Sequence, residues 1–116
     1  MSKLILNPEY RLYERNGKAF CSSRQVAEEF GKRHADVLRS IEQITAPTSG
    51  VSTEFTERNF ALSRYKDASG KWNPEYLMTK DGFAILAMGF TGKKAMRFKE
   101  AYIRRFNEME AFIRSL

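Results

Sequence analysis

The hydrophobic and polar positions at the end of the chain predict one long amphipathic helix. Placed at helical spacing, six apolar residues fall on one broad stripe: Ala95, Phe98, Tyr102, Phe106, Met109 and Ile113. A stripe of this width lets a helix pack on a core. Lys93, Arg97 and Arg104 fall on the opposite side, with Lys94 and Arg105 beside them. The pattern therefore predicts a helix with an aromatic core-facing side and a basic outer side.

Two earlier stretches have the pattern of β-hairpins. In residues 10–21, two short runs with apolar positions flank an Asn-Gly pair, which a type I′ turn prefers because both positions tolerate positive φ. Residues 58–79 form the second, with aromatic runs on both sides of a turn-rich tip near Asp67–Lys71. Pro74 indicates that the second strand of this hairpin begins at an edge or a bulge, because proline cannot donate to a ladder.

Between the hairpins the spacing of apolar residues predicts two short helices. Ser22 and Gln25 fit a capping box at the start of the first helix, and Gly31 is placed to end it in the left-handed conformation. The second helix has its apolar positions at Val37, Leu38, Ile41 and Ile44. The composition of residues 45–53 predicts a flexible loop after it.

A further short helix is expected before the long one. Thr79-Lys-Asp-Gly82 can cap a nearly all-apolar segment from Phe83 to Met88, which predicts a buried helix. Gly89-Phe-Thr-Gly92 then breaks this helix and turns the chain into the last one.

Residues 23–44 satisfy the spacing of a helix–turn–helix. Ala27 provides the small residue at which two helices approach, Gly31 provides the turn, and Val37 follows as the brace. Ser40 stands where another apolar residue is usual, and Ile41 can take its place. Any helical hairpin has the same spacing, so a purely structural hairpin stays open as the alternative.

Composition and charge narrow the class of protein. A chain of 116 residues, 42% of them hydrophobic, suits one folded domain over residues 1–116. No apolar run reaches the roughly 20 residues that span a bilayer, so no membrane partner is expected. The start of the chain is too soon broken by Pro8 for a signal peptide, and the single Cys21 is compatible with a reducing cytoplasm.

The net charge of +6 and pI near 9.6 make a polyanion a plausible partner. Residues 91–116 hold seven lysines and arginines against three glutamates, so +4 of the net charge lies there. A solvated helix face is the alternative explanation of this charge.

If the helix–turn–helix is real, its second helix enters the major groove by its N-terminal residues. The basic residues and the acidic residue that would read the groove or its edge phosphates are Arg24, Lys32, Arg33, His34, Asp36 and Arg39. The second hairpin would act as a wing, touching the backbone through Lys66 and Lys71, although a structural hairpin is an equal alternative. Lys93, Lys94 and Arg97 would hold phosphate at the start of the last helix.

Other chemistries find little support. The Gly89–Lys94 stretch lacks the spacing of a phosphate-binding loop, and the βααβ pattern around an RNA-binding Gly-x-x-Gly clamp is missing. One His and one Cys make no catalytic triad, and the carboxylates lie at polar helix positions. We therefore expect no enzyme, no catalytic residues, no metal site and no cofactor.

Most of the chain, about residues 20–112, resembles the phage regulatory protein Rha family. The resemblance is carried by residues 23–41 (SRQVAEEFGKRHADVLRSI), Asn59-Phe60, Tyr65-Lys-Asp67, Gly70, and residues 74–83 (PEYLMTKDGF), 88–95 (MGFTGKKA) and 98–110 (FKEAYIRRFNEME). It implies a phage or prophage regulator acting through a DNA-binding domain of winged-helix character, similar to the N-terminal modules of phage antirepressors. Some members of the family carry an additional C-terminal domain.

The sequence thus predicts an α+β, winged-helix-like domain with a helix–turn–helix, β-hairpins and a long C-terminal amphipathic helix. The expected function is to bind double-stranded DNA and control phage or prophage genes. The alternative is an antirepressor-type module that acts on a repressor or host factor without contacting DNA. The apolar residues Met109, Phe112, Ile113 and Leu116 extend beyond what one small domain covers, which predicts a homodimer through this helix end.

Overall fold

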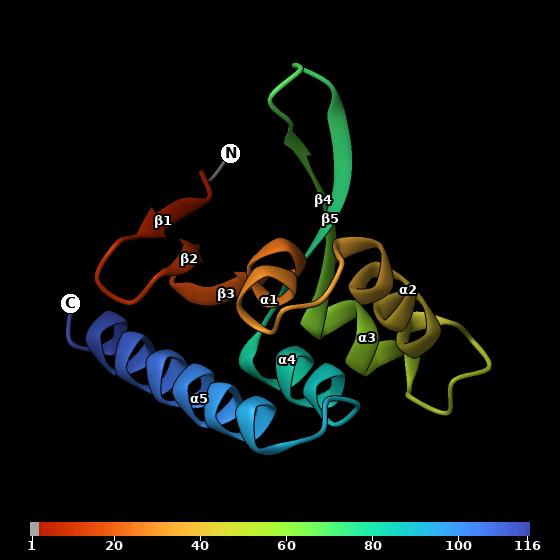
Figure 1. The fold of residues 1–116 in the computed structure, drawn as a ribbon. Coiled ribbons are helices and arrows are strands. Elements are labelled where there is room, and N and C mark those ends of the chain that lie inside the picture. The colour runs from red at the N-terminus through yellow and green to blue at the C-terminus, as the bar shows by residue number, and fades with distance from the viewer. Residues whose placement is uncertain (1–2) are drawn as a thin grey trace.

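The computed structural model describes residues 3–116, and in this range five helices pack around one five-stranded antiparallel sheet (Figure 1). The strands lie in the order β1-β2-β3-β5-β4. The elements are β1 (Ile5–Asn7), β2 (Leu12–Arg15), β3 (Lys18–Ser22), α1 (Ser23–Glu29), α2 (His34–Thr45), α3 (Thr53–Asn59), β4 (Phe60–Lys66), β5 (Trp72–Met78), α4 (Lys80–Ala87) and α5 (Lys93–Arg114). The predicted α+β class is confirmed.

The core lies where α1, α4 and α5 pack against β3. Phe83 of α4 and Tyr102 of α5 stack at 4.7 Å between ring centroids, and both side chains are fully buried. Phe30, at the end of α1, contacts both rings from the side. The predicted stripe of α5 is confirmed at its centre, since Tyr102, Phe106 and Met109 are all buried.

The first predicted hairpin is confirmed as β2–β3. Asn16 and Gly17 have φ of 54° and 74°, as the Asn-Gly pattern of a type I′ turn requires. The hairpin starts later than predicted, because residues 8–11 form a turn in which Arg11 has a φ of 55°. A short strand, β1, precedes this turn and pairs with β2. It was not predicted, because three residues before a proline carry no periodic pattern.

The start and end of α1 follow the sequence closely. The Ser22 hydroxyl accepts from the Gln25 backbone and the Gln25 side chain accepts from the Ser22 backbone, which confirms the capping box. Gly31 has a φ of 67° and donates to Glu28, and Lys32 donates to Ala27. This is a Schellman ending, and it turns the chain within four residues into α2.

The expected loop and hairpin after α2 need one correction. Residues 53–59 form the helix α3, although the sequence predicted a loop up to residue 53, a hairpin from residue 58 and no element for residues 54–57. The Ser52 hydroxyl caps it by accepting from the Phe55 backbone at 3.1 Å. The helix is mostly polar, so no apolar repeat marks it. The hairpin itself is confirmed as β4–β5, from Phe60 to Met78.

Pro74 lies where β5 has one open edge. It faces Arg64 of β4, whereas β3 pairs only with the far end of β5, at Leu77 and Met78. The expectation of an edge at the start of this strand is therefore confirmed, and the outer part of the hairpin projects from the body (Figure 1).

The last two helices differ from prediction in two details. Thr79 caps α4 as expected, but the helix begins at Lys80 rather than Phe83. Arg105 does not face outward with the basic residues of α5, since its side chain is only 12% exposed. Its guanidinium reaches back to the carbonyl oxygens of Tyr10 and Arg11, at 2.9 and 2.7 Å. The long side chain thus ties α5 to the turn before β2.

Candidate nucleic-acid interface

Tyr65 joins the second hairpin to the beginnings of α1 and α2. The Arg24 guanidinium lies over its ring, with the Cζ atom 3.8 Å from the ring centroid. The His34 imidazole, in the first residue of α2, meets the same ring edge-on at 6.0 Å. Two of the predicted site residues therefore converge on β4, and the hairpin is held beside the N-terminus of α2.

His34 is also hydrogen-bonded to Ser23 at the start of α1. The Ser23 hydroxyl accepts from the Tyr76 amide at 2.9 Å and is hydrogen-bonded to His34 Nε2 at 2.8 Å. Burial lowers the pKa of His34, and the nearby positive charge of Arg24 lowers it further. Both effects favour the neutral form of the imidazole. Ser23 is fully buried, so we interpret this pair as a structural link between α1, α2 and β5.

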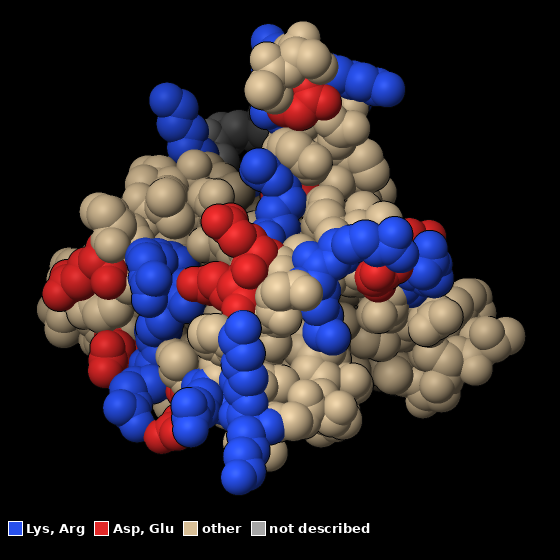
Figure 2. All heavy atoms as spheres, viewed as in Figure 1, with Lys and Arg blue, Asp and Glu red and all other residues tan. Residues whose placement is uncertain are grey.

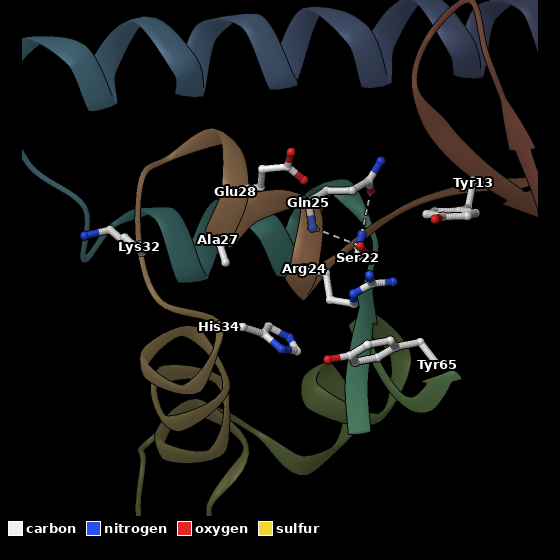
Figure 3. Close-up of a pocket in the computed structure, with 9 residues that line it drawn as sticks. All are labelled: Tyr13, Ser22, Arg24, Gln25, Ala27, Glu28, Lys32, His34 and Tyr65. Atoms are coloured by element: carbon white, nitrogen blue, oxygen red, sulfur yellow. Dashed lines mark hydrogen bonds between the residues drawn. The ribbon is translucent and has the colours of Figure 1, made fainter. Parts of the chain in front are cut away.

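A shallow open depression of about 450 Å³ lies between these elements (Figure 3). Arg24, Lys32 and His34 line it together with Tyr65, and Glu28 adds a negative charge at its rim. The Lys32 ammonium lies 4.7 Å from the ring centroid of Phe90, in the turn between α4 and α5. The depression therefore brings together three of the predicted DNA-contacting residues.

The first turn of α2 carries a charged triad. Arg33 donates to the Asp36 carboxylate through Nε at 3.0 Å and Nη2 at 3.2 Å, and Arg39 Nη1 donates to it at 3.1 Å. The hydrogen bonds from Arg33 hold the pKa of Asp36 below its usual value, and the same contact raises the pKa of Arg33. The two arginine side chains are 81% and 66% exposed. Asp36 therefore orients two exposed guanidinium groups, and a direct contact of its carboxylate with cytosine stays a prediction.

Lys66 and Lys71 stand at the tip of the hairpin, as predicted. The Asp67 carboxylate orders this tip by accepting from the backbones of Ser69 and Lys71 and from the Asn73 amide, all within 2.9 Å. The Ser69 hydroxyl also donates to this carboxylate, at 2.6 Å, and this bond, followed by those from Lys71 and Asn73, holds the pKa of Asp67 at about 2. The tip is thus pre-organised rather than loose.

Arg64 and Trp72 of the hairpin were not among the predicted site residues, whereas Lys66 was. Arg64 and Lys66 lie on one face of β4, and each positive group is 5.8 Å from the ring centroid of Trp72 on β5. The pairing register of the hairpin would have predicted this cluster, since Lys66 faces Trp72 and Arg64 lies two residues away on the same face.

Lys93, Lys94 and Arg97 form a second, separate group at the exposed N-terminus of α5. In Figure 1 this end lies across α1 from the hairpin. Figure 2 shows Lys and Arg side chains at the hairpin tip, around the α1–α2 turn and along α5, with acidic side chains between them over α1. Glu28 and Glu29 lie at the end of α1. The predicted cations therefore fall into two groups rather than one continuous stripe.

Other kinds of site find no counterpart in residues 3–116. No group of three or more His, Cys, Asp or Glu side chains is arranged there to hold a metal ion. Within the same range no helix is long and apolar enough to cross a membrane. Cys21 is a free thiol, and its complete burial raises its pKa far above the usual value.

Comparison with known proteins finds relatives in bacteria and phages. The chain is 40% identical to an uncharacterized protein of Haemophilus influenzae, over 76% of this chain and 50% of the relative. It is 37% identical to the SPbeta prophage-derived putative antirepressor protein YoqD of Bacillus subtilis, over 88% of this chain and 40% of the relative. It is 36% identical to an uncharacterized 22.8 kDa protein of Salmonella phage P22, over 98% of this chain and 58% of the relative.

These matches cover only part of each relative. The chain spans between 40% and 58% of the length of the three proteins. No solved structure matches the chain. A family model, described as phage regulatory protein Rha, matches residues 21–111, which include both cationic groups and every element from α1 to α4. The chain belongs to the phage regulatory protein Rha family.

Proposed function

We propose that this domain binds double-stranded DNA and controls phage or prophage gene expression. In this proposal α1 and α2 form a helix–turn–helix, the N-terminus of α2 enters the major groove, and the β4–β5 hairpin serves as a wing. The carrying observation is the junction at Tyr65, where Arg24 at 3.8 Å and His34 at 6.0 Å contact the hairpin. This junction keeps the exposed start of α2 and the projecting hairpin on one rigid frame, as a joint contact with one duplex requires.

The residues divide into three roles. Arg33 and Arg39 project from the first turns of α2, and Asp36 fixes their guanidinium groups, so they are the candidates for reading guanine edges. Arg24 and Lys32, at the rim of the depression, are placed to neutralise the phosphates beside that groove. Lys66 and Lys71, at the hairpin tip, would contact the phosphate backbone of the DNA.

The group at the start of α5 has a separate task. Lys93, Lys94 and Arg97 lie across α1 from the hairpin and would bind phosphates farther along the duplex. The backbone N–H groups at the N-terminus of α5 would assist them, because a helix start attracts anions. This group is positioning in character, since phosphate contacts carry no base information.

The proposal is tested by titrating a labelled mixed-sequence duplex and following its fluorescence anisotropy. We expect a complex in the micromolar range at low salt. Replacing both Arg33→Gln and Arg39→Gln should weaken it about 10-fold or more. Arg104→Gln is the matched control, because Arg104 is 65% exposed and paired with Glu100 in a surface ion pair of the same kind. No complex, or equal losses in the two variants, would count against the proposal.

A second candidate function follows from the relative whose printed name is a putative antirepressor. A domain of that kind would bind a repressor or host factor and would not need to contact DNA. Such a domain would not need phosphate contacts to bind its protein partner. If no complex with the duplex forms at low salt, this alternative is favoured.

A further inference from the structure

The outer face of the β4–β5 hairpin combines a large aromatic ring with positive charge. Trp72 is 56% exposed and Leu62 is 68% exposed on the same face. The Arg64 and Lys66 cations each lie 5.8 Å from the Trp72 ring centroid. Isolated exposed apolar residues are common on protein surfaces, but an exposed tryptophan bracketed by two cations is typical of a contact surface.

The opposite face of the hairpin is already occupied. Side chains alternate between the two faces, and Tyr65 points toward Arg24 and His34. Glu75, two pairs farther from the tip, is only 8% exposed on that inner side. The face with Trp72 is therefore the one that the hairpin offers to a partner.

The charge and rigidity of this face favour, as its binding partner, a polyanion that also has apolar surfaces. The Trp72 ring has no acidic neighbour on its face of the hairpin, where Arg64, Lys66 and Pro74 surround it in the register. Asp67, the acidic residue of the tip, uses its carboxylate on Ser69, Lys71 and Asn73. Because the tip is ordered before binding, little further conformational entropy is lost when a partner docks.

From this geometry we infer that Trp72 is a DNA contact of the hairpin, packed on a sugar or base edge of the duplex while Arg64 and Lys66 hold the flanking phosphates. The inference rests on the proposed function, because it needs the hairpin to meet the duplex. It adds an apolar contact to the phosphate contacts of the tip, of the kind that wedging side chains make in a groove. Such a contact depends less on salt than the lysines do, since no counterion is released by it.

Trp72 is the sole tryptophan of the chain, so its fluorescence reports on this face directly. We would measure how efficiently acrylamide, a neutral quencher, reduces the emission of the unmodified protein with and without saturating duplex. The expected result is clear protection of Trp72 in the complex. Binding detected by anisotropy without any protection of Trp72 would overturn the inference and leave the proposed function standing. Absence of binding would instead overturn both.

Variants test the same contact by affinity. Trp72→Ala should weaken duplex binding by about 5- to 100-fold, and Trp72→Phe should retain most of the affinity because the aromatic face remains. Ile5→Ala is the matched control, since Ile5 is 62% exposed on β1, at the other edge of the sheet. Equal affinity of Trp72→Ala and the unmodified protein would contradict the inference.

A last experiment distinguishes DNA from an acidic protein as the partner of this face. Poly-glutamate at the same concentration of charges replaces the duplex in the acrylamide experiment. The inference requires stronger protection by duplex than by poly-glutamate. Equal or stronger protection by poly-glutamate would assign the face to an acidic polypeptide instead.

Discussion

Arg105 connects the two ends of the chain through a single side chain. Besides the carbonyl oxygens of Tyr10 and Arg11, its guanidinium meets the Glu29 carboxylate at 3.3 Å and lies 4.4 Å from the Tyr102 ring centroid. Tyr102 donates to the same carboxylate. The buried cation is therefore compensated from several sides, and it holds α5, α1 and the turn before β2 together.

We predict that Arg105→Met lowers the free energy of unfolding by about 2–4 kcal/mol, because the Tyr10 carbonyl, the Arg11 carbonyl and the Glu29 carboxylate each lose a charged donor, although Gln25 and Tyr102 still donate to the latter two. Methionine retains much of the apolar stem, so the loss reports on the polar contacts. Urea unfolding followed by circular dichroism measures it. Arg104→Met, an exposed neighbour, should change stability by less than about 0.5 kcal/mol. Equal effects in the two variants would mean that the buried contacts contribute nothing.

Gly82 permits a close approach of α4 to the end of α3. A Cβ atom at this position would lie 2.4 Å from the Asn59 carbonyl oxygen, well inside contact distance. Asn59 also accepts from the Thr79 backbone and side chain, so it cannot move away without loss of these bonds. The glycine is thus required by its neighbour, and not by its own backbone conformation.

Gly82→Ala should therefore destabilise the domain by about 1–3 kcal/mol, although alanine normally favours a helix. Gly89→Ala is the control, because its added Cβ would meet nothing closer than the Leu86 carbonyl oxygen at 3.6 Å. Thermal unfolding of both variants decides the matter. A higher midpoint for Gly82→Ala than for the unmodified protein would refute the close approach.

At the scale of elements, local signals predicted the structure where they were complete. The Asn-Gly turn, the capping box at Ser22 and the glycine at the end of α1 each act within a few residues, and all were confirmed. The helix α3 was missed because its cap is followed by few apolar positions. Arg105 was misplaced because its partners lie more than 70 residues away in sequence, beyond any helical pattern.

The tip of the β4–β5 hairpin depends on an ionised Asp67. Its folded pKa is about 2 against an ordinary value of 3.8, so the unfolded chain binds a proton first. The stability that it contributes is fully present above about pH 4 and is lost as the pH falls toward 2. The Asp67 carboxyl resonance in an NMR titration should still report the ionised form at pH 3.8. A midpoint near 3.8 would contradict the hydrogen-bonded tip.

For the whole molecule, the sequence identified the cations but not their grouping. Arg24, Lys32 and His34 converge because the α1–α2 turn folds them around Tyr65. The N-terminal end of α5, which carries Lys93 and its neighbours, lies across α1 from the hairpin in Figure 1, and Lys32 reaches the turn before it by lying over Phe90. Periodicity within one helix places residues on faces, but only the packing of helices on the sheet decides which faces adjoin. The role of each cation in binding stays a prediction.

The expectation that Met109 extends beyond the domain is wrong, because Met109 is fully buried and Ile113 packs against the same core, so the proposal of a homodimer rests on Phe112 and Leu116 alone. Phe112 is 40% exposed and Leu116 is 83% exposed, while Tyr10 covers one side of Phe112 with a centroid distance of 6.0 Å. Sedimentation velocity at tens of micromolar should detect a dimer, and Phe112→Glu should shift it to monomer. A monomer at all concentrations for the unmodified protein would end this proposal.

The salt dependence of duplex binding tests the central claim most directly. If the start of α2 and the hairpin together neutralise several phosphates, the logarithm of the affinity should fall with the logarithm of salt concentration with a slope of about −3 or steeper. The double variant Lys66→Gln and Lys71→Gln, which removes two proposed phosphate contacts of the hairpin tip, should reduce that slope by about 1 to 2. A slope near zero, or no complex at micromolar protein and low salt, would contradict DNA binding and favour the antirepressor-type alternative.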